Sequence, residues 1–225
     1  ADPEVDWLAE IRAENRTVIY LGQGPRVMGA VSVADQPRLT SAAAIAALRQ
    51  GGVQTIAMMT GDRRPVALRI GAELGIRPDE IHADLLPADK VDLVAQLAAG
   101  GKLAFVGDGV NDAAALARAD VGIALGTGTD VAIESADVVL MSGDLQGVVN
   151  ALRVSEHTLS NIRQNLFWAF GYNVALIPVA AGALYPAFGV LLSPVMAAGA
   201  MALSSVFVLS NALRLRRVRA GEGRA

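Results

Sequence analysis

Two carboxylates and an amide stand close together in the string Gly107–Asp112: Asp108, Asn111 and Asp112. Hard oxygen ligands at this spacing suit Mg²⁺, and the glycines of the string let backbone and ligand approach closely. Asp112 alone is equally well explained as a helix cap, because Asp and Asn are good N-terminal caps. That explanation does not account for the string as a whole, so the sequence favours a magnesium site.

Two further strings offer groups that hold a phosphoryl oxygen. Thr60-Gly61-Asp62 follows an apolar run and supplies a hydroxyl and a backbone amide before the next helical pattern. Lys90, in the string Pro87-Ala88-Asp89-Lys90, would add a fixed cation that offsets the charge of a transferring phosphoryl group. Each string is weak evidence by itself. A tripeptide such as Thr60–Asp62 is a short pattern, and a lone lysine near a helix start is usually solvated.

Short apolar runs alternate with helical patterns around these strings. The alternation predicts an α/β fold, a doubly wound parallel sheet covered by helices on both faces. In such sheets the ligand crevice lies at the C-terminal ends of the strands, which is where Thr60–Asp62 and Gly107–Asp112 stand. The expected helices are 39–50, 65–74, 88–99, 111–118 and 130–135, and the expected strands are 53–59, 102–106, 121–124 and 138–141. Upstream we expect a helix over 2–15 and a hairpin of strands 17–21 and 27–33.

The order and spacing of the three strings along the chain strengthen their interpretation as parts of one phosphoryl-transfer site. Thr60–Asp62, Pro87-x-x-Lys90 and Gly107–Leu116 resemble the second, third and fourth motifs of the haloacid-dehalogenase phosphotransferases in their P-type ATPase form. The resemblance implies ATP as substrate and Mg²⁺ as cofactor. It implies that Asp108 is a Mg²⁺ ligand supported by Asn111 and Asp112, that Thr60 and Lys90 bind the phosphoryl group, and that Gly61 and Asp62 shape the same edge and assist dephosphorylation.

Parts of the family's machinery are missing from this chain. An aspartate in Asp-Lys-Thr-Gly-Thr attacks ATP in that family, and the chain contains neither that string nor any cysteine of the Cys-Pro-Cys membrane site. Asp35 and Arg38 look like the family's Asp-x-x-Arg, where the nucleotide domain rejoins the phosphorylation domain. We therefore expect a C-terminal fragment whose partner is the missing upstream part of the same ATPase, and which alone forms no phosphoenzyme.

The distribution of charge divides the chain into a soluble part and a membrane part. No Asp, Glu, Lys, Arg or His occurs from Gln164 to Leu213, and this stretch is long enough for two spans of a lipid bilayer. Four arginines follow it, at 214, 216, 217 and 219, so the positive-inside rule predicts a multi-pass protein of the cell membrane with the α/β domain and the C-terminus in the cytoplasm. A buried hairpin of a soluble core is the alternative. The formal charge of −3 and the lack of a basic stripe argue against nucleic acid as a partner.

These observations give a domain plan. The expected parts are the tail of a nucleotide-binding domain (1–33), a phosphorylation domain of haloacid-dehalogenase type (34–150), a stalk helix (151–165), two transmembrane helices (166–184 and 190–213) and a basic cytoplasmic tail (214–225).

Polar side chains inside the predicted spans indicate an ion pathway, because such groups are costly in hydrocarbon. The candidates are Tyr172, Asn173, Met201, Ser204 and Ser205. Thioether sulfur suits Cu(I), although Ser and Met also occur at ordinary helix contacts. Tyr-Asn-x4-Pro with Met-x-x-Ser-Ser resembles the copper(I) branch of the heavy-metal P-type ATPases, which implies Cu⁺ as the transported ion. Phe207 departs from that branch, whose members often have a small Ser there.

Two other functions stay open at this point. A membrane-tethered phosphatase of the haloacid-dehalogenase type would need its own nucleophilic aspartate at the end of a first strand, and the nearest region, 31–35, lacks the Asp or Lys-Thr-Gly that should follow. The chain in isolation is also compatible with an inactive truncated product.

Overall fold

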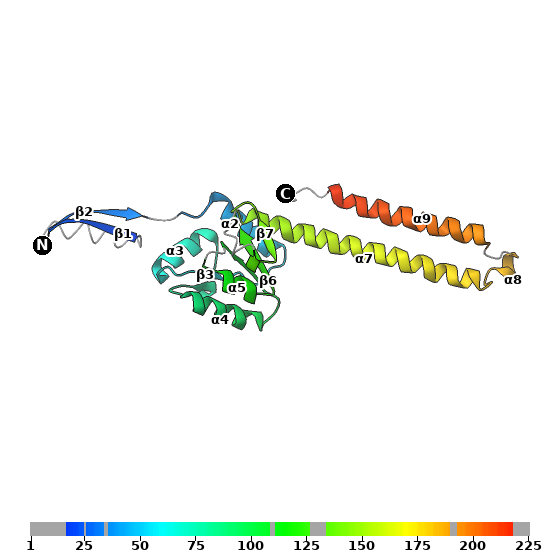
Figure 1. Ribbon diagram of the computed structural model, residues 1–225, viewed down its shortest axis with the longest axis horizontal. Coiled ribbons are helices and arrows are strands. Elements are labelled where there is room, and N and C mark those ends of the chain that lie inside the picture. The colour runs from blue at the N-terminus through cyan, green and yellow to red at the C-terminus, as the bar shows by residue number, and fades with distance from the viewer. Residues whose placement is uncertain are drawn as a thin grey trace. The chain divides into compact units, whose positions relative to one another are not determined.

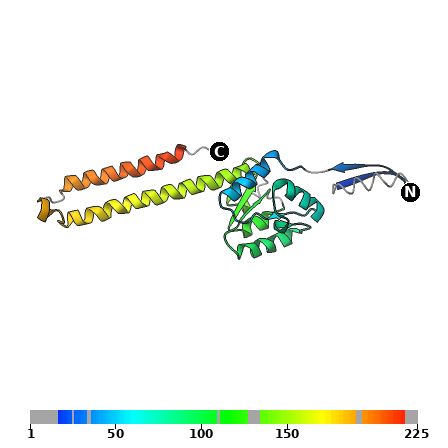
Figure 2. The same cartoon turned by 180° about the vertical axis from the view of Figure 1, so that it is seen from behind.

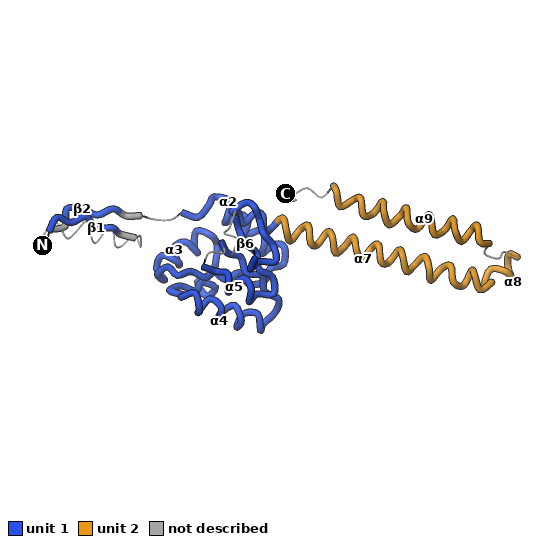
Figure 3. The backbone as a smooth tube through the Cα atoms, viewed as in Figure 1, with its two compact units in different colours: residues 1–149 blue, residues 150–225 orange. Residues whose placement is uncertain are grey.

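Secondary structure in this protein follows the composition of its segments, with β-branched runs in strands and alanine-rich runs in helices. The computed structural model describes residues 17–24, 26–33, 36–108, 111–126, 134–189 and 193–217. The chain divides into two compact units, residues 1–149 and residues 150–225, shown in different colours in Figure 3. Each unit is described below by itself.

The first unit begins with the predicted β-hairpin. Strand β1 (Thr17–Gln23) pairs with strand β2 (Arg26–Val33) in antiparallel register, with a shift between Leu21 and Gly22. Within the described residues these two strands pair only with each other. The helix expected over 2–15 lies outside the described residues.

The α/β part that follows contains parallel strands between helices, as the sequence predicted (Figures 1 and 2). Strand β3 pairs with β4, and β5, β6 and β7 form a second parallel sheet in that order. The strands are β3 (Met58–Met59), β4 (Ile81–His82), β5 (Ala104–Gly107), β6 (Val121–Leu125) and β7 (Val138–Leu140). The helices are α2 (Leu39–Gln50), α3 (Arg64–Leu74), α4 (Pro87–Ala98) and α5 (Ala113–Arg118).

The strand expected over 53–59 is wrong in its extent, because only Met58 and Met59 form β3. The backbone N–H of Ile56 donates instead to the Glu80 carboxylate, at 3.3 Å, so this stretch is held by a side chain rather than by a neighbouring strand. Strand β4 was not predicted, since two residues are too few for a periodic pattern. Of the helix expected over 130–135, the described residues contain only the helical pair 134–135.

Two buried apolar clusters hold the α/β part together. Helices α4 and α5 pack with strands β5 and β6 in the first cluster, which contains Val94, Phe105, Ala115, Leu116 and Ala124. Helices α2 and α3 pack with strand β4 in the second, which contains Ile45, Ala67, Ile76 and Ile81. Met59 at the end of β3 packs against the first cluster, and Met58 packs against the second. Strand β3 therefore joins the two cores.

The second unit is a helical hairpin. Helix α7 (Gln146–Ala180), which starts in the first unit, is followed by the short helix α8 (Tyr185–Phe188), and helix α9 (Pro194–Leu213) continues as a 3-10 turn over Arg214–Arg217. Helix α7 ends at Ala180, and Gly182 beyond it adopts a left-handed backbone with φ +88°, whereas the sequence predicted a transmembrane helix over 166–184. Among the described residues, Pro194–Arg216 is the one helix long and apolar enough to cross a membrane.

One stripe of half-buried residues runs along each long helix of this hairpin, at the spacing of one helical face. On α7 the stripe consists of Asn161, Asn165, Ala169, Tyr172, Leu176 and Val179. On α9 it consists of Ala197, Ala200, Ser204, Val208, Asn211 and Ala212. We call the contact between these two stripes the seam. Along the middle of the seam, small residues such as Ala169, Ala200 and Ser204 alternate with larger ones such as Tyr172, Leu176 and Val208.

Glu80, at the end of the 3-10 turn Pro78–Glu80, is the buried acid of the second core, with 3% of its surface exposed. Its carboxylate accepts hydrogen bonds from the Arg49 and Arg77 guanidinium groups, the latter at 2.9 Å. The bond from Arg49 is the largest cause that lowers the pKa of Glu80 from 4.5 to about 2. The native state therefore binds the proton more weakly than the unfolded state, so Glu80 stabilises the fold above pH 4.5 and loses this effect as the pH falls toward 2.

We predict that Glu80→Gln lowers the free energy of unfolding of the first unit by about 2 kcal/mol at pH 7, since charged hydrogen bonds are lost. The difference from the parent chain should shrink as the pH falls below 4.5. Amide hydrogen exchange in α2 and β4, measured by mass spectrometry on the detergent-solubilised chain, reports this unit separately. Parallel pH profiles for the two proteins would contradict the prediction.

Candidate functional site

The N-terminal ends of α4 and α5 are joined by an ion pair between two predicted site residues. The Lys90 Nζ atom lies 2.7 Å from Asp112 Oδ1, and the two side chains keep only 17% and 13% of their surface exposed. Lys90 follows Pro87 in the first turn of α4, and Asp112 is the residue directly before α5. The lysine predicted to bind a phosphoryl group is thus held in place by a carboxylate of the predicted magnesium string, not free in solvent.

Strand β5 delivers the same string to this place. Gly107 ends the strand, and a side chain there would come within 2.8 Å of the Asp112 carboxylate, so the close turn requires glycine. Asp108 and Asn111 are exposed beyond the strand end. Gly109 and Val110 lie outside the described residues. The structure thus brings Asp112 to Lys90 and leaves Asp108 and Asn111 accessible at the same turn.

Thr60, Gly61 and Asp62 form a tight turn after β3. The Thr60 hydroxyl donates to Asp62 Oδ2 at 3.0 Å and accepts from the Asp62 backbone N–H at 3.1 Å. The backbone of Thr60 is also bonded on both sides, donating to the His82 carbonyl and accepting from the Leu85 N–H. This turn is therefore fixed against the segment 82–85 before any ligand binds.

Asp84 in that segment is a positioning residue that the sequence analysis missed. It is the one non-glycine with a positive φ, +56°, among the described residues. Its backbone N–H donates to the Asp62 carbonyl at 2.8 Å, and its carboxylate accepts from the Arg64 N–H at the start of α3, at 3.2 Å. An aspartate between a short strand and a Pro-x-x-Lys string was the available signal, because Asp tolerates the left-handed conformation and caps helices.

One core supports every strand and helix that carries these motifs. Met59, directly before Thr60, packs against the cluster that contains Phe105 of β5 and Leu116 of α5. Val91, directly after Lys90, packs against the same cluster. Rigid elements packed on a common core give a site a defined geometry. The Leu85 N–H, which donates to the Thr60 carbonyl, stands two residues before α4, so the Thr60 turn lies beside the start of the helix that carries Lys90.

The residues at this edge fit a magnesium ion in part. Asp108, Asn111 and Asp112 offer oxygen donors only, as Mg²⁺ prefers. Within the described ranges, no group of three or more Asp, Glu, His or Cys side chains stands close enough to hold a metal. Two carboxylates and an amide make an incomplete ligand set, which Mg²⁺ normally completes with water and phosphate oxygens.

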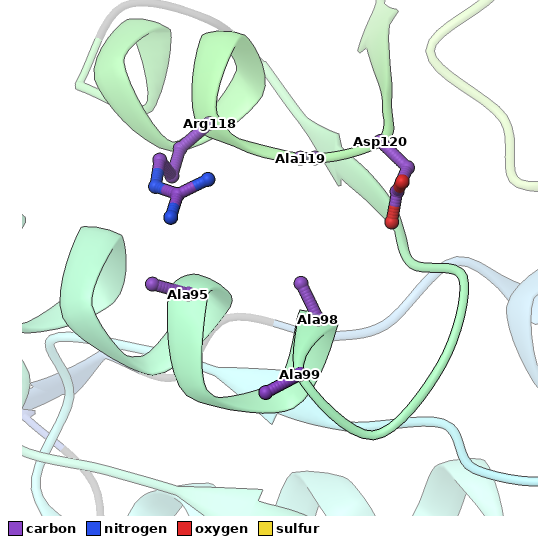
Figure 4. Close-up of a pocket in the computed structure, with 6 residues that line it drawn as sticks. All are labelled: Ala95, Ala98, Ala99, Arg118, Ala119 and Asp120. Atoms are coloured by element: carbon purple, nitrogen blue, oxygen red, sulfur yellow. The ribbon is translucent and has the colours of Figure 1, made fainter.

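A pocket of about 420 Å³ lies at the other end of α4 and α5. Figure 4 shows Arg118 extending from the end of α5 toward the alanines of α4, with Asp120 at the side. Asp120 accepts hydrogen bonds from Lys102 and from the Leu103 N–H, and the bond from Lys102 lowers the pKa of Asp120 below its usual value. The pocket walls are mainly alanine methyl groups, so this space offers little chemistry.

The helical hairpin separates the five predicted ion residues into two groups. Tyr172 and Ser204 lie in the seam, half-buried, whereas Asn173, Met201 and Ser205 are exposed. Met201 keeps 70% of its surface exposed. Asn173 and Ser205 each donate to a carbonyl of their own helix, four residues back.

The exposed group shares one side of the hairpin. Trp168 of α7 stacks on Phe207 of α9 with centroids 6.4 Å apart, which fixes one side of the seam. At about 100° per residue, Asn173, Met201 and Ser205 project to the opposite side. The register set by Trp168 and Phe207 places Asn173 level with Met201 and Tyr172 level with Ser204. Phe207, the departure from the copper pattern, therefore lies away from Met201.

Comparison with protein families identifies the first unit. Residues 2–120 match the sequence model of the haloacid dehalogenase-like hydrolases, and residues 96–152 match a second model with the same description. The first match covers more than half of the chain.

Curated relatives are longer proteins of one kind. The chain is 56% identical over 207 residues to the copper-transporting ATPase 2 of Rhizobium meliloti, covering 92% of this chain and 25% of the relative. It is 53% identical over 213 residues to the silver exporting P-type ATPase of Salmonella typhimurium, covering 94% of this chain and 26% of the relative. The chain thus spans about a quarter of the length of these relatives.

Among solved structures, the chain resembles a zinc-transporting PIB-type ATPase in the E2.Pi state. The TM-score is 0.80 with 36% identity, and the match covers 96% of this chain and 34% of the other. Both units of the fold are therefore found in that protein.

We predict that Asp84→Ala loosens the Thr60–Asp62 turn, because alanine loses the cap of α3 and disfavours the left-handed backbone, at about 1 kcal/mol for each effect. Asp84→Asn is the matched control, since asparagine keeps a side-chain acceptor and tolerates this conformation. Amide exchange at residues 60–64 should accelerate about thirtyfold in the alanine variant and little in the asparagine variant. Equal acceleration in both would show that the cap and the backbone preference are not responsible.

Proposed function

Because the chain belongs to the haloacid dehalogenase-like hydrolase family, in its heavy-metal P-type ATPase branch, we propose that it is part of an ATP-driven heavy-metal exporter. In this proposal the first unit takes part in an aspartyl-phosphate cycle in the cytoplasm, and the helical hairpin lies in the cell membrane. The nucleophilic aspartate is supplied by sequence that this chain does not contain.

The meeting of three strings at one edge carries the proposal. The Lys90 Nζ atom lies 2.7 Å from Asp112 Oδ1, and Asp108 directly follows strand β5. Met59, directly before the Thr60 turn, packs on the core that also contains Phe105 of β5. A cation, a hydroxyl and a carboxylate pair are the groups that phosphoryl transfer needs for positioning and charge neutralisation.

Strand pairing supports a place for the missing nucleophile. Strands β3 and β5 belong to separate parallel sheets in the described part of the chain, yet Met59 of β3 packs against the cluster beneath β5. A strand inserted between them would join both sheets into one doubly wound sheet. Its C-terminal end would then lie at the edge where Thr60 and Asp108 stand, as catalysis by an aspartate at that end requires.

Each residue then has a separate task. The Thr60 hydroxyl and the Gly61 and Asp62 backbone amides bind equatorial phosphoryl oxygens, while Lys90 neutralises charge that develops during transfer. Asp108 holds Mg²⁺ with support from Asn111 and Asp112, and the ion when bound supplies further charge neutralisation. Asp62 orients the water that removes the phosphoryl group. The ion pair with Asp112 keeps Lys90 extended toward this edge while the phosphoryl group is absent.

Copper(I) is the proposed cargo. The stretch 164–213 has no charged side chain, so a monovalent soft cation meets thioether, hydroxyl and amide groups there without fixed counter-charge. Asn173 and Met201 share one side of the hairpin at one level, with Ser205 one helical turn further along the same side of α9, and the seam residues Tyr172 and Ser204 are their neighbours in sequence. The names of the copper and silver relatives agree with a soft monovalent ion.

We predict that Asp108→Ala abolishes Mg²⁺-dependent phosphorylation of the intact ATPase, measured as ³²P incorporation from ATP, because the magnesium ligand is lost. Asp92→Ala is the matched control, an exposed aspartate of α4 outside the site. Unchanged incorporation in the Asp108 variant would contradict the assignment. Hydrolysis of phosphate esters by the present chain alone would support the tethered phosphatase instead.

Loss of the thioether should weaken metal binding in the membrane. Met201→Ala in the intact protein is expected to lower the Cu(I) stoichiometry of the membrane domain in an anaerobic titration. Met196→Ala is the control, since helical periodicity places this methionine of α9 on the side of Trp168 and Phe207. Equal stoichiometry in both variants and the parent would exclude Met201 as a ligand.

A further inference from the structure

Three asparagines form a partly buried hydrogen-bond network between α7 and α9 that the proposed site does not use. Asn161 Nδ2 donates to the backbone carbonyl of Asn211 at 2.7 Å. Asn165 Nδ2 donates to Asn161 Oδ1 at 3.0 Å, and Asn211 Nδ2 donates to Asn165 Oδ1 at 2.9 Å. Asn161 is 7% exposed, and the other two are half-buried. We call this network the amide relay.

We propose that the amide relay sets the register of the α7–α9 hairpin and thereby positions the residues of the ion site. Asn161, Asn165 and Asn211 act as positioning residues, because none of them belongs to the group that we expect to touch the ion.

The chemistry of the seam explains why such a device is needed. Beyond the relay the seam contains mainly apolar residues, among them Ala169, Leu176, Ala200 and Val208. Small apolar surfaces pack almost equally well after a shift of one turn, so apolar contact alone specifies the alignment weakly. A single buried asparagine is known to fix the register of paired helices, because any other alignment leaves its amide unpaired.

Hydrogen bonding in the relay is specific to the observed alignment. Each asparagine side chain donates once within the relay, and two side-chain oxygens accept within it. The third oxygen, Asn211 Oδ1, accepts from the Arg214 guanidinium at 3.3 Å. A shift of one helical turn would break both side-chain bonds between the helices. A shifted hairpin would leave these amides without their partners, so the observed alignment should be favoured at least about tenfold.

Register decides whether the ion residues meet. The two helices run antiparallel, so residue numbers rise along α7 where they fall along α9. Asn165 is bonded to Asn211, and three residues further along α7 Trp168 stacks on Phe207, four residues earlier on α9. Two turns from the relay this places Tyr172 opposite Ser204. A shift of one turn would move Met201 by about 5.4 Å relative to Asn173, too far for one ion to contact both.

Disulfide cross-linking measures this register in the chain as it exists, because the chain contains no cysteine. The in-register pair is Tyr172→Cys with Ser204→Cys, and the shifted pair is Tyr172→Cys with Val208→Cys. Each pair is oxidised in membranes, in the parent chain and in an Asn161→Leu/Asn165→Leu background. These two replacements remove both bonds between the helices, because the bond from Asn161 goes to the backbone carbonyl of Asn211. Gln164→Leu is the matched control, since Gln164 is an exposed amide beside Asn165 that bonds only Ser160 of its own helix.

The parent chain and the Gln164 control should cross-link the in-register pair preferentially. Removal of the relay should lower the ratio of in-register to shifted cross-linking at least about tenfold, as expected for one or two unmade hydrogen bonds. An unchanged ratio would overturn the proposal. Loss of both cross-links would also overturn it, because the relay would then hold the helices together without selecting their alignment.

The consequence for transport rests on the proposed function. The experiment below distinguishes a failure of the proposed ion site from a failure of the proposed role of the relay. In the intact protein, Asn211→Leu should lower the Cu(I) stoichiometry of the membrane domain, as Met201→Ala does, and Asn211→Ser should restore it in part by keeping a hydrogen-bonding group. If neither Met201→Ala nor Asn211→Leu alters the stoichiometry, the ion site is wrong while the cross-linking ratio still decides the register. If only Met201→Ala lowers it, the positioning role of the relay is overturned.

Discussion

The ion pair between Lys90 and Asp112 is the contact on which the geometry of the candidate site depends. It joins the starts of α4 and α5, and both side chains are largely removed from water. Loss of one partner from such a pair leaves an uncompensated charge and costs about 3–5 kcal/mol when burial is complete. The pair therefore limits where Lys90 can lie, and it does so with a residue of the magnesium string. Cation and carboxylates are consequently positioned by one interaction.

That interaction depends in turn on the packing beneath it. Val94 of α4 and Leu116 of α5 are fully buried in the cluster that also receives Phe105 of β5. Close packing holds the helix starts at a fixed separation, since cores of this density resist small displacements. The Thr60 turn reaches the same edge by a different route, through Met59 below it and the Asp84 segment beside it. A fixed site thus arises from local turns, each weak alone, above a common core.

Sequence patterns predicted the elements that repeat and missed those held by single side chains. Helix α2 and the parallel strands β5, β6 and β7 follow from periodicity and apolar runs. The failure at 53–57 has a specific cause, because the Ile56 N–H is bonded by Glu80, a residue distant in sequence. Asp84 and the amide relay were missed for the same reason, since a cap or a bond between helices depends on spatial neighbours. The motif strings could be recognised in the sequence because each of them places its chemical groups at a fixed spacing along the chain.

The helical hairpin extends the same logic to a stretch of the chain, 164–213, that contains no charged side chain. An apolar seam provides area but little directional preference, and in a membrane the hydrophobic effect does not favour one helix contact over another. Directional preference must then come from the few polar groups, and each must be paired to be tolerated. Asn161, Asn165 and Asn211 are bonded to one another, whereas Asn173 and Ser205 are bonded only to their own helix. In our proposals, polar side chains of the first kind fix the alignment, and those of the second kind keep oxygens for a cation. The hairpin of the proposed exporter would thus separate the task of holding its helices in register from the task of binding an ion.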